Sequence, residues 1–205
     1  MMGAMKVIAL LPLILVLALP AQAQDAGRDG GDPSQVTLPA PPVDPAIRAA
    51  RELDRLFGAL RQTEDANAKQ IEEKIWANWQ VNPSPTAELL LRQARLAMSD
   101  GELATSEEML NELVGTYPDY AEALNRRAAL YFKMKRYDEA LADITSVLDM
   151  EPRHFGAMAL RGAIYAAQGN IDGAKLALEE ALSINPHQDD VKAALTQLTH
   201  DYPDI

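Results

Sequence analysis

The chain repeats one pattern of residues at a fixed interval: YDEALADITSVLDMEP at 137–152 is followed by IDGAKLALEEALSINP at 171–186. Thirty-four positions separate Pro152 from Pro186, and Pro118 lies a further 34 positions upstream. Self-similarity at such a period indicates a repeat architecture. Units that end two residues after each of these prolines span residues 87–120, 121–154 and 155–188.

Each unit predicts two amphipathic helices. Its positions 4, 8 and 11 lie on one stripe of a first helix, and positions 17, 20, 24 and 27 lie on one stripe of a second. Positions 8 and 20 carry small residues that allow the two helices to approach closely: Ala94, Ala128, Gly162, Ser106, Ala140 and Ala174. Because one such pair cannot bury its apolar face alone, we expect the pairs to stack around a continuous core.

The turn inside each unit carries its own signal. Gly101 and Gly169 stand where a positive φ is needed, a conformation that glycine adopts readily. Lys135 takes that place in the middle unit, so we expect its turn to close differently. At position 7 of the same unit, Arg127 is interpreted as a packed side chain paired with Asp143. The alternative interpretation is that Arg127 contacts a ligand. For Arg161, the equivalent residue of the third unit, the residue opposite is an alanine, so its partner is open.

These features resemble the tetratricopeptide-repeat family over residues 87–188. The stretches NRRAALYFKMKRYDEALADI (125–144) and RGAIYAAQGNIDGA (161–174) follow the family pattern of small residues at positions 8 and 20, an aromatic residue at 11 and a proline at 32. The first unit departs from it at Ala97 and Ser106. The resemblance implies an all-α fold, a right-handed superhelix of stacked antiparallel helix pairs (an α-solenoid). It also implies a non-catalytic protein–protein interaction module, or scaffold, with a concave groove.

The positions that line the groove in this family are basic in the first two units and small or apolar in the third. We expect the groove to bind a peptide or a partner protein through an acidic segment or a free C-terminus. The candidate partner-binding residues are Arg92, Arg95, Asn125, Arg126, Phe132 and Lys133. The carboxylate-clamp version of the family, with Lys and Asn at set positions, is not inferred, because the first unit has Leu91 and Arg95 there and the third has Gly156 and Leu160.

Two further helices are predicted before the repeats, at 46–62 and 64–80. Within residues 46–86 they form a degenerate repeat or an N-terminal cap, and a further alternative has them fill the groove and pair with Arg92 and Arg95. Trp76 and Trp79 are expected to pack in the core against Leu89 and Leu90 rather than to form an aromatic ligand box. Residues 189–205 are expected to form a C-terminal capping helix whose N-cap is Asp189 or Asp190.

The first residues resemble a targeting signal. Lys6, the apolar run 7–19 and the Ala21-Gln22-Ala23 site are typical of a secretory signal peptide at 1–23, followed by a flexible Pro/Gly-rich linker at 24–45. We therefore expect export, to a bacterial periplasm, without membrane insertion after cleavage. The chain has no cysteine and a net charge of −11, so it forms no disulfide and repels nucleic acid.

The sequence contains no pattern that indicates catalysis. His154 and His187 fall in successive loops between units, which stacking keeps roughly 10 Å apart, so we expect no metal site. Neighbouring acidic residues point about 100° apart on a helix and form no carboxylate dyad. We expect no catalytic residue and no cofactor. Two alternatives stay open: a structural subunit of a cell-envelope complex, and an enzyme whose site the sequence does not reveal.

Overall fold

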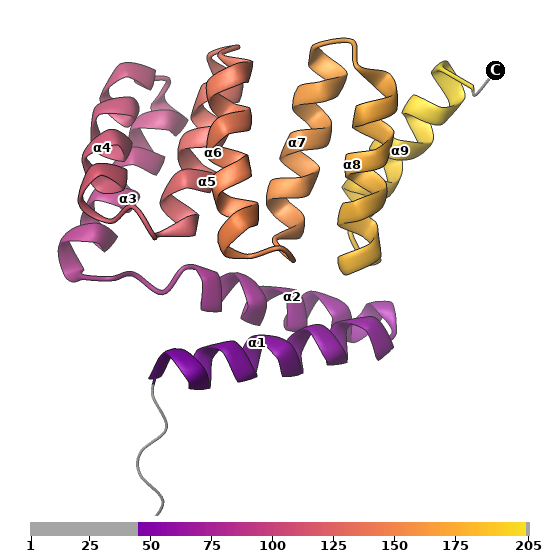
Figure 1. Ribbon diagram of the computed structural model, residues 1–205, viewed down its shortest axis with the longest axis horizontal. Coiled ribbons are helices and arrows are strands. Elements are labelled where there is room, and N and C mark those ends of the chain that lie inside the picture. The colour runs from indigo at the N-terminus through magenta and orange to yellow at the C-terminus, as the bar shows by residue number, and fades with distance from the viewer. Residues whose placement is uncertain (1–44, 204–205) are drawn as a thin grey trace, which may run out of the picture. The chain divides into compact units, whose positions relative to one another are not determined.

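The computed structural model describes residues 45–203, and this part of the chain is built from helices joined by short loops (Figure 1). The helices are α1 (Pro45–Gln62), α2 (Asp65–Trp79), α3 (Pro85–Asp100), α4 (Leu103–Thr116), α5 (Ala121–Lys133), α6 (Tyr137–Met150), α7 (Phe155–Ala167), α8 (Ile171–Ile184) and α9 (Asp189–Asp201). Between residues 45 and 203, none of them is both long and apolar enough to cross a membrane. The predicted signal peptide and linker lie outside the described residues, apart from Pro45, with which α1 begins.

Three antiparallel pairs, α3/α4, α5/α6 and α7/α8, stack side by side, which confirms the predicted solenoid (Figure 1). The small residues at positions 8 and 20 lie at the centre of each pair and are buried. A side chain at Gly162 would place its Cβ 2.7 Å from Leu178 Cδ2, which is closer than van der Waals contact. Small residues are therefore required where the two helices of a pair meet.

The turns inside the three pairs correct one prediction. Lys135 has a φ of 60°, next to 83° at Gly101 and 78° at Gly169. Arg136 N donates to Tyr131 O at 2.9 Å, as Asn170 N does to Tyr165 O at 2.9 Å. The middle turn thus closes in the same way as the other two, because the helix ends require the left-handed residue whichever side chain stands there.

The position-7 arginines pack inside the repeats. Arg127 Nε donates to Asp143 Oδ2 at 2.8 Å and its Nη2 donates to Oδ1 at 2.7 Å, which confirms the predicted pair between two helices. Arg161 pairs with Glu180 of α8, one turn beyond the alanine that the sequence places opposite it. Both arginines join the first helix of a pair to its second.

The last helix, α9, packs against the final pair. Val191 of α9 packs with Met158, Leu178 and Ala181 of α7 and α8. The predicted cap is wrong: Gln188 is the N-cap residue, and Asp189 and Asp190 fall in the first turn of α9. There their negative charges interact favourably with the helix dipole, although neither residue is the N-cap.

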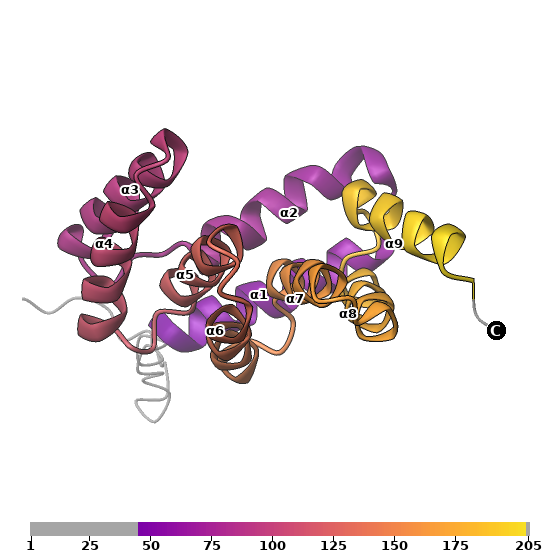
Figure 2. The same ribbon diagram turned by 90° about the horizontal axis from the view of Figure 1, so that it is seen from above.

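The N-terminal pair is neither a repeat nor an end cap. Figures 1 and 2 show α1 and α2 lying across the ends of α5 to α8, along the loops that join the repeats. Phe57 and Ile75 of this pair share a buried cluster with Phe155 at the start of α7, and Ile184 at the end of α8 packs against that cluster. Arg153, in the loop before α7, pairs with Asp54 of α1 at 2.7 Å, so an inter-repeat loop also holds the N-terminal pair.

Candidate functional site

Two of the predicted groove residues, Arg92 and Arg95, project from α3 and are exposed. Within residues 45–203 neither forms an ion pair, so they do not pair with α1 or α2. Leu89 and Leu96 lie on the same helix at i−3 and i+4 from Arg92, and they are 42% and 58% exposed. This face of α3, which we call the basic face, is therefore both cationic and apolar.

Asn125 and Arg126 have an internal role. Both donate to Glu122, which is only 1% exposed: Arg126 Nε lies 2.6 Å from Glu122 Oε1, and Asn125 Nδ2 lies 3.3 Å from Oε2. A buried carboxylate needs such partners, because an unpaired charge inside a protein is very costly. These two residues therefore stabilise a buried carboxylate, unlike the exposed arginines of α3.

Phe132 and Lys133 lie at the far end of α5. Lys133 Nζ donates to Met98 O at 3.0 Å, at the C-terminal end of α3, where a cation also favours the helix dipole. Phe132 is half-buried and its ring centroid lies 6.1 Å from that of Tyr137. Of the six predicted residues, only Lys133 on α5 therefore extends the exposed charge of the basic face.

The two tryptophans are half-buried and pack against the core, but beside other residues than those predicted. Trp79 stacks on His154 with ring centroids 4.0 Å apart and an interplanar angle of 10°, and Trp76 meets Phe155 edge-on at 5.5 Å. The expected packing against Leu89 and Leu90 is wrong, because α2 lies along the inter-repeat loops rather than beside α3. His154 is fully buried, and its Nδ1 accepts from Ala157 N at 3.1 Å.

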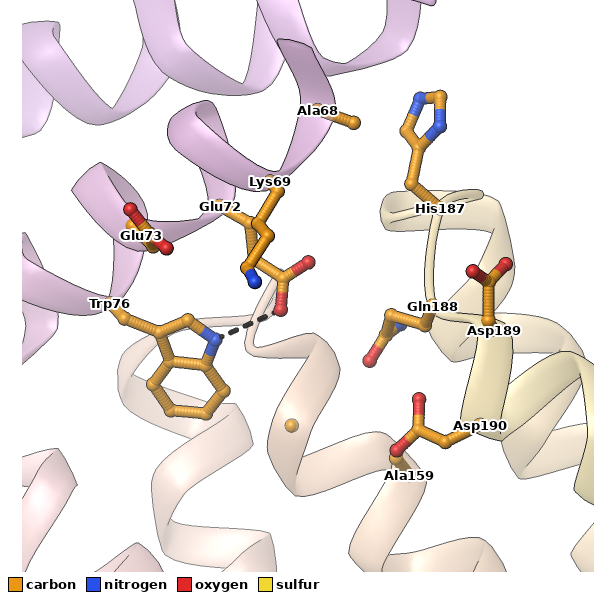
Figure 3. A pocket seen from close by; sticks show the side chains of 11 residues that line it. Ala68, Lys69, Glu72, Glu73, Trp76, Ala159, His187, Gln188, Asp189 and Asp190 are labelled. Carbon is orange, nitrogen blue, oxygen red and sulfur yellow. Dashed lines mark hydrogen bonds between the residues drawn. The ribbon is translucent and has the colours of Figure 1, made fainter. Parts of the chain in front are cut away.

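A pocket of about 650 Å³ opens between α2, the start of α7 and the start of α9 (Figure 3). Its volume lies within the range of about 300–1,000 Å³ typical of ligand sites. Most of its lining side chains are polar or charged. The complete lining consists of Ala68, Lys69, Glu72, Glu73, Trp76, Gly156, Ala159, His187, Gln188, Asp189 and Asp190.

Two hydrogen bonds to Glu72 of α2 fix one wall of this pocket. Glu72 Oε1 accepts from Trp76 Nε1 at 3.3 Å, and Glu72 Oε2 accepts from Asn185 Nδ2 at 3.1 Å. Asn185 is fully buried in the loop between α8 and α9. A Cβ on Gly156 would meet Trp76 Cη2 at 2.5 Å, so glycine is needed there for α2 to approach.

A second hollow of about 400 Å³ continues from the pocket along α7, and the two share Ala159 and Asp190. Its walls are mostly small or apolar and come from α7, α8 and α9: Ala159, Gly162, Ala163, Ala166, Leu178, Asp190, Val191, Ala194, Gln197 and Leu198. We call the pocket and this hollow together the α7 groove. Its apolar part coincides with the small groove residues that the sequence predicts for the third unit.

The groove offers charge and shape rather than reactive groups. Among the residues that the structure describes, no three His, Asp or Glu side chains lie close enough together to hold a metal ion. Four carboxylates, one lysine and one histidine line the pocket, which makes its surface negative. Sequence reasoning missed this acidic wall, because half of it comes from α2, whose position does not follow the repeat. The glycine at position 2 of the third unit is the signal that another element approaches there.

Comparison with known proteins identifies the family of the chain. One tetratricopeptide-repeat model matches residues 131–198 and a second matches residues 91–144. A TPR repeat-containing protein of Rhizobium etli is 37% identical over 137 residues, 66% of this chain and 67% of that protein. DnaJ homolog subfamily C member 3 of Bos taurus is 29% identical over 108 residues, 53% of this chain and 21% of that protein.

Solved structures agree on the fold. The first TPR of Spaghetti (RPAP3), bound to the HSP90 peptide SRMEEVD, superposes with a TM-score of 0.56 at 19% sequence identity. The superposition covers 60% of this chain and 98% of that one. At this identity the likeness concerns the arrangement of helices alone.

Proposed function

Because the chain belongs to the tetratricopeptide-repeat family, we propose that it is a non-catalytic interaction module that binds a segment of a partner protein along α7. The observation that carries the proposal is the α7 groove itself, in which two contiguous hollows share Ala159 and Asp190. Its floor consists of small side chains, which let the backbone of a bound segment approach the helix. The solved relative bound to an HSP90 peptide supports a role in peptide binding.

A variant that fills the groove tests this function. Ala163 is half-buried and lines the apolar hollow, so Ala163→Phe is expected to occupy the space of the ligand without disturbing the buried core. Short random peptides displayed on phage are selected on the wild-type chain, and their affinities are then measured for both proteins. The affinity of the selected peptides is expected to fall at least about tenfold, because each displaced apolar contact contributes on the order of 1 kcal/mol.

A matched control places the same side chain elsewhere. Ala104 is exposed on α4, away from the α7 groove, so Ala104→Phe is expected to bind the selected peptides like the wild type. Equal circular dichroism of the three proteins verifies their folding. If Ala163→Phe is folded and binds every selected peptide unchanged, the α7 groove is not the binding site.

The basic face is a second candidate site for the same function. Arg92 and Arg95 have no carboxylate partner among residues 45–203, and the exposed Leu89 and Leu96 flank Arg92. An acidic partner segment with apolar residues, or a free C-terminus, fits this combination. Arg92→Glu together with Arg95→Glu is expected to abolish binding of the selected peptides if they bind here, and to leave it unchanged if they bind along α7.

The setting of this function is also proposed rather than observed. The pattern at residues 1–23 favours export to a bacterial periplasm, which cell fractionation and the intact mass of the mature chain would test. A structural subunit of an envelope complex would need a large, flat, apolar patch. The large exposed apolar side chains of the described residues come instead from several separate elements, which favours the binding module.

A further inference from the structure

We propose that the pocket at the head of the α7 groove takes a cationic side chain, lysine or arginine, from the bound partner segment. This inference rests on the proposed function and adds the chemical class of the partner. The α1–α2 pair, which lies outside the repeats, supplies one wall of the pocket. The specificity therefore comes from the way in which this chain joins its N-terminal helices to its repeats.

The carboxylates of the pocket divide into engaged and available ones. Glu72 already accepts hydrogen bonds from Trp76 and Asn185, and Asp189 forms an ion pair with Lys192 at 3.1 Å. Glu73 and Asp190 are exposed and form no ion pair within residues 45–203. They line the same pocket from α2 and from the first turn of α9. Figure 3 shows Lys69 and Glu72 of α2 facing Gln188 and Asp190 across the open space.

The negative charge of this pocket fits a side chain better than a bare ion. No three carboxylate or imidazole groups converge to metal-binding distance in the described part of the chain. The pocket also measures about 650 Å³, far more than one ion fills. An ammonium or guanidinium group on a long aliphatic stem can enter a pocket of this size, with its charge among the carboxylates and its stem against the Trp76 ring.

The neighbouring hollow indicates what accompanies the cation. Asp190 and Ala159 belong to both hollows, so a segment that seats its cation beside Asp190 continues directly over Ala163 and Ala166. Those residues leave room for apolar side chains and close backbone approach. The expected partner segment therefore joins a lysine or arginine to a short apolar stretch.

The experiment selects short random peptides displayed on phage on the full chain and on the double variant Glu73→Gln/Asp190→Asn. Peptides selected on the wild type are expected to be enriched in lysine and arginine next to apolar residues, relative to the unselected library. Their affinity is expected to fall by up to about tenfold in the double variant, because two charge-assisted contacts of modest strength are lost. A rise in salt concentration is expected to weaken wild-type binding and to affect the double variant less.

A control variant removes the same charge elsewhere. Glu108→Gln/Asp149→Asn changes two exposed acids on α4 and α6 and is expected to bind like the wild type. Enriched peptides without a cationic preference would overturn this inference and leave the proposed function standing, whereas a failure to enrich any peptide would overturn both. Selected peptides that match residues 24–44, or self-association in sedimentation that the double variant abolishes, would assign the pocket to the chain itself and overturn the proposal.

Discussion

Ser106 occupies the position that alanine fills in the second and third repeats. All three side chains are fully buried, and the hydroxyl oxygen of Ser106 has no hydrogen-bond partner. Leaving a buried hydroxyl unpaired costs about 1–3 kcal/mol. Ser106→Ala is therefore expected to raise the free energy of unfolding by about 1 kcal/mol, measured by urea denaturation with an unchanged dependence on urea concentration.

Ser183 supplies the comparison for this prediction. It is exposed on α8 and donates to Glu180 O at 2.7 Å. Ser183→Ala is expected to change the free energy of unfolding by less than about 0.5 kcal/mol. A loss of stability in Ser106→Ala would mean that the hydroxyl is paired in solution.

Single residues also show how far the sequence predicts the site. The pairing of Arg127 with Asp143 follows from two positions inside one repeating unit, and the structure confirms it. Arg126 has the same residue type and lies next to it, yet it serves the buried Glu122. The i,i+4 spacing of Glu122 and Arg126 on α5 makes this pair possible, but the spacing does not show that Glu122 is buried. Spacing alone therefore allows both pairs, whereas the burial of Glu122, which sets the role of Arg126, follows only from the assembled structure.

At the scale of an element, the turn between α5 and α6 keeps a lysine where glycine is favoured. Lys135 adopts a φ of 60° and is exposed. A left-handed conformation costs a residue with a Cβ about 1–2 kcal/mol, and the greater freedom of glycine in the unfolded chain offsets part of this. Lys135→Gly is therefore expected to raise the free energy of unfolding by roughly 0.5–1 kcal/mol.

The reverse change serves as its control. Gly169 has a φ of 78° at the equivalent turn, so Gly169→Lys is expected to lower the free energy of unfolding by a similar amount. Urea denaturation of both variants and the wild type measures the effects. A loss of stability in Lys135→Gly would show that the lysine side chain makes a contact that outweighs its backbone strain.

The N-terminal pair shows why periodicity predicts some elements fully and others only in part. The structure places α1 and α2 within one residue of the predicted ends, because their apolar stripes are local features. Ser84 lies 34 positions before Pro118, which suggested one more repeat. Yet that register places Leu60 and Glu72 at positions 8 and 20, where the repeats carry small residues. Trp76 and Trp79 pack against Phe155 and His154, and that contact depends on the assembled repeats.

At the scale of the whole described structure, His154 lies at the junction between the N-terminal pair and the repeats. Both tryptophans of the chain contact its ring: Trp79 face to face, and Trp76 edge-on with centroids 5.5 Å apart. Its Nδ1 accepts a hydrogen bond, so the proton of the neutral ring is on Nε2, which is buried without a partner. Docking of α1–α2 therefore requires the neutral imidazole.

This junction predicts a loss of stability in acid. Burial, aided by Arg126 and opposed by Glu151, lowers the pKa of the His154 imidazole from its ordinary 6.5 to about 4. Because the unfolded chain binds this proton more readily, the contribution of His154 is full above pH 6.5 and is lost as the pH falls toward 4. Urea denaturation at pH 7 and 4.5 is expected to show a loss about 2–3 kcal/mol larger in the wild type than in His154→Asn, which keeps a capping oxygen but does not titrate. Tryptophan fluorescence reports on the same junction and is expected to shift on acidification in the wild type alone. Equal pH profiles of the two proteins would show that the junction opens to water and that His154 titrates there like an exposed histidine.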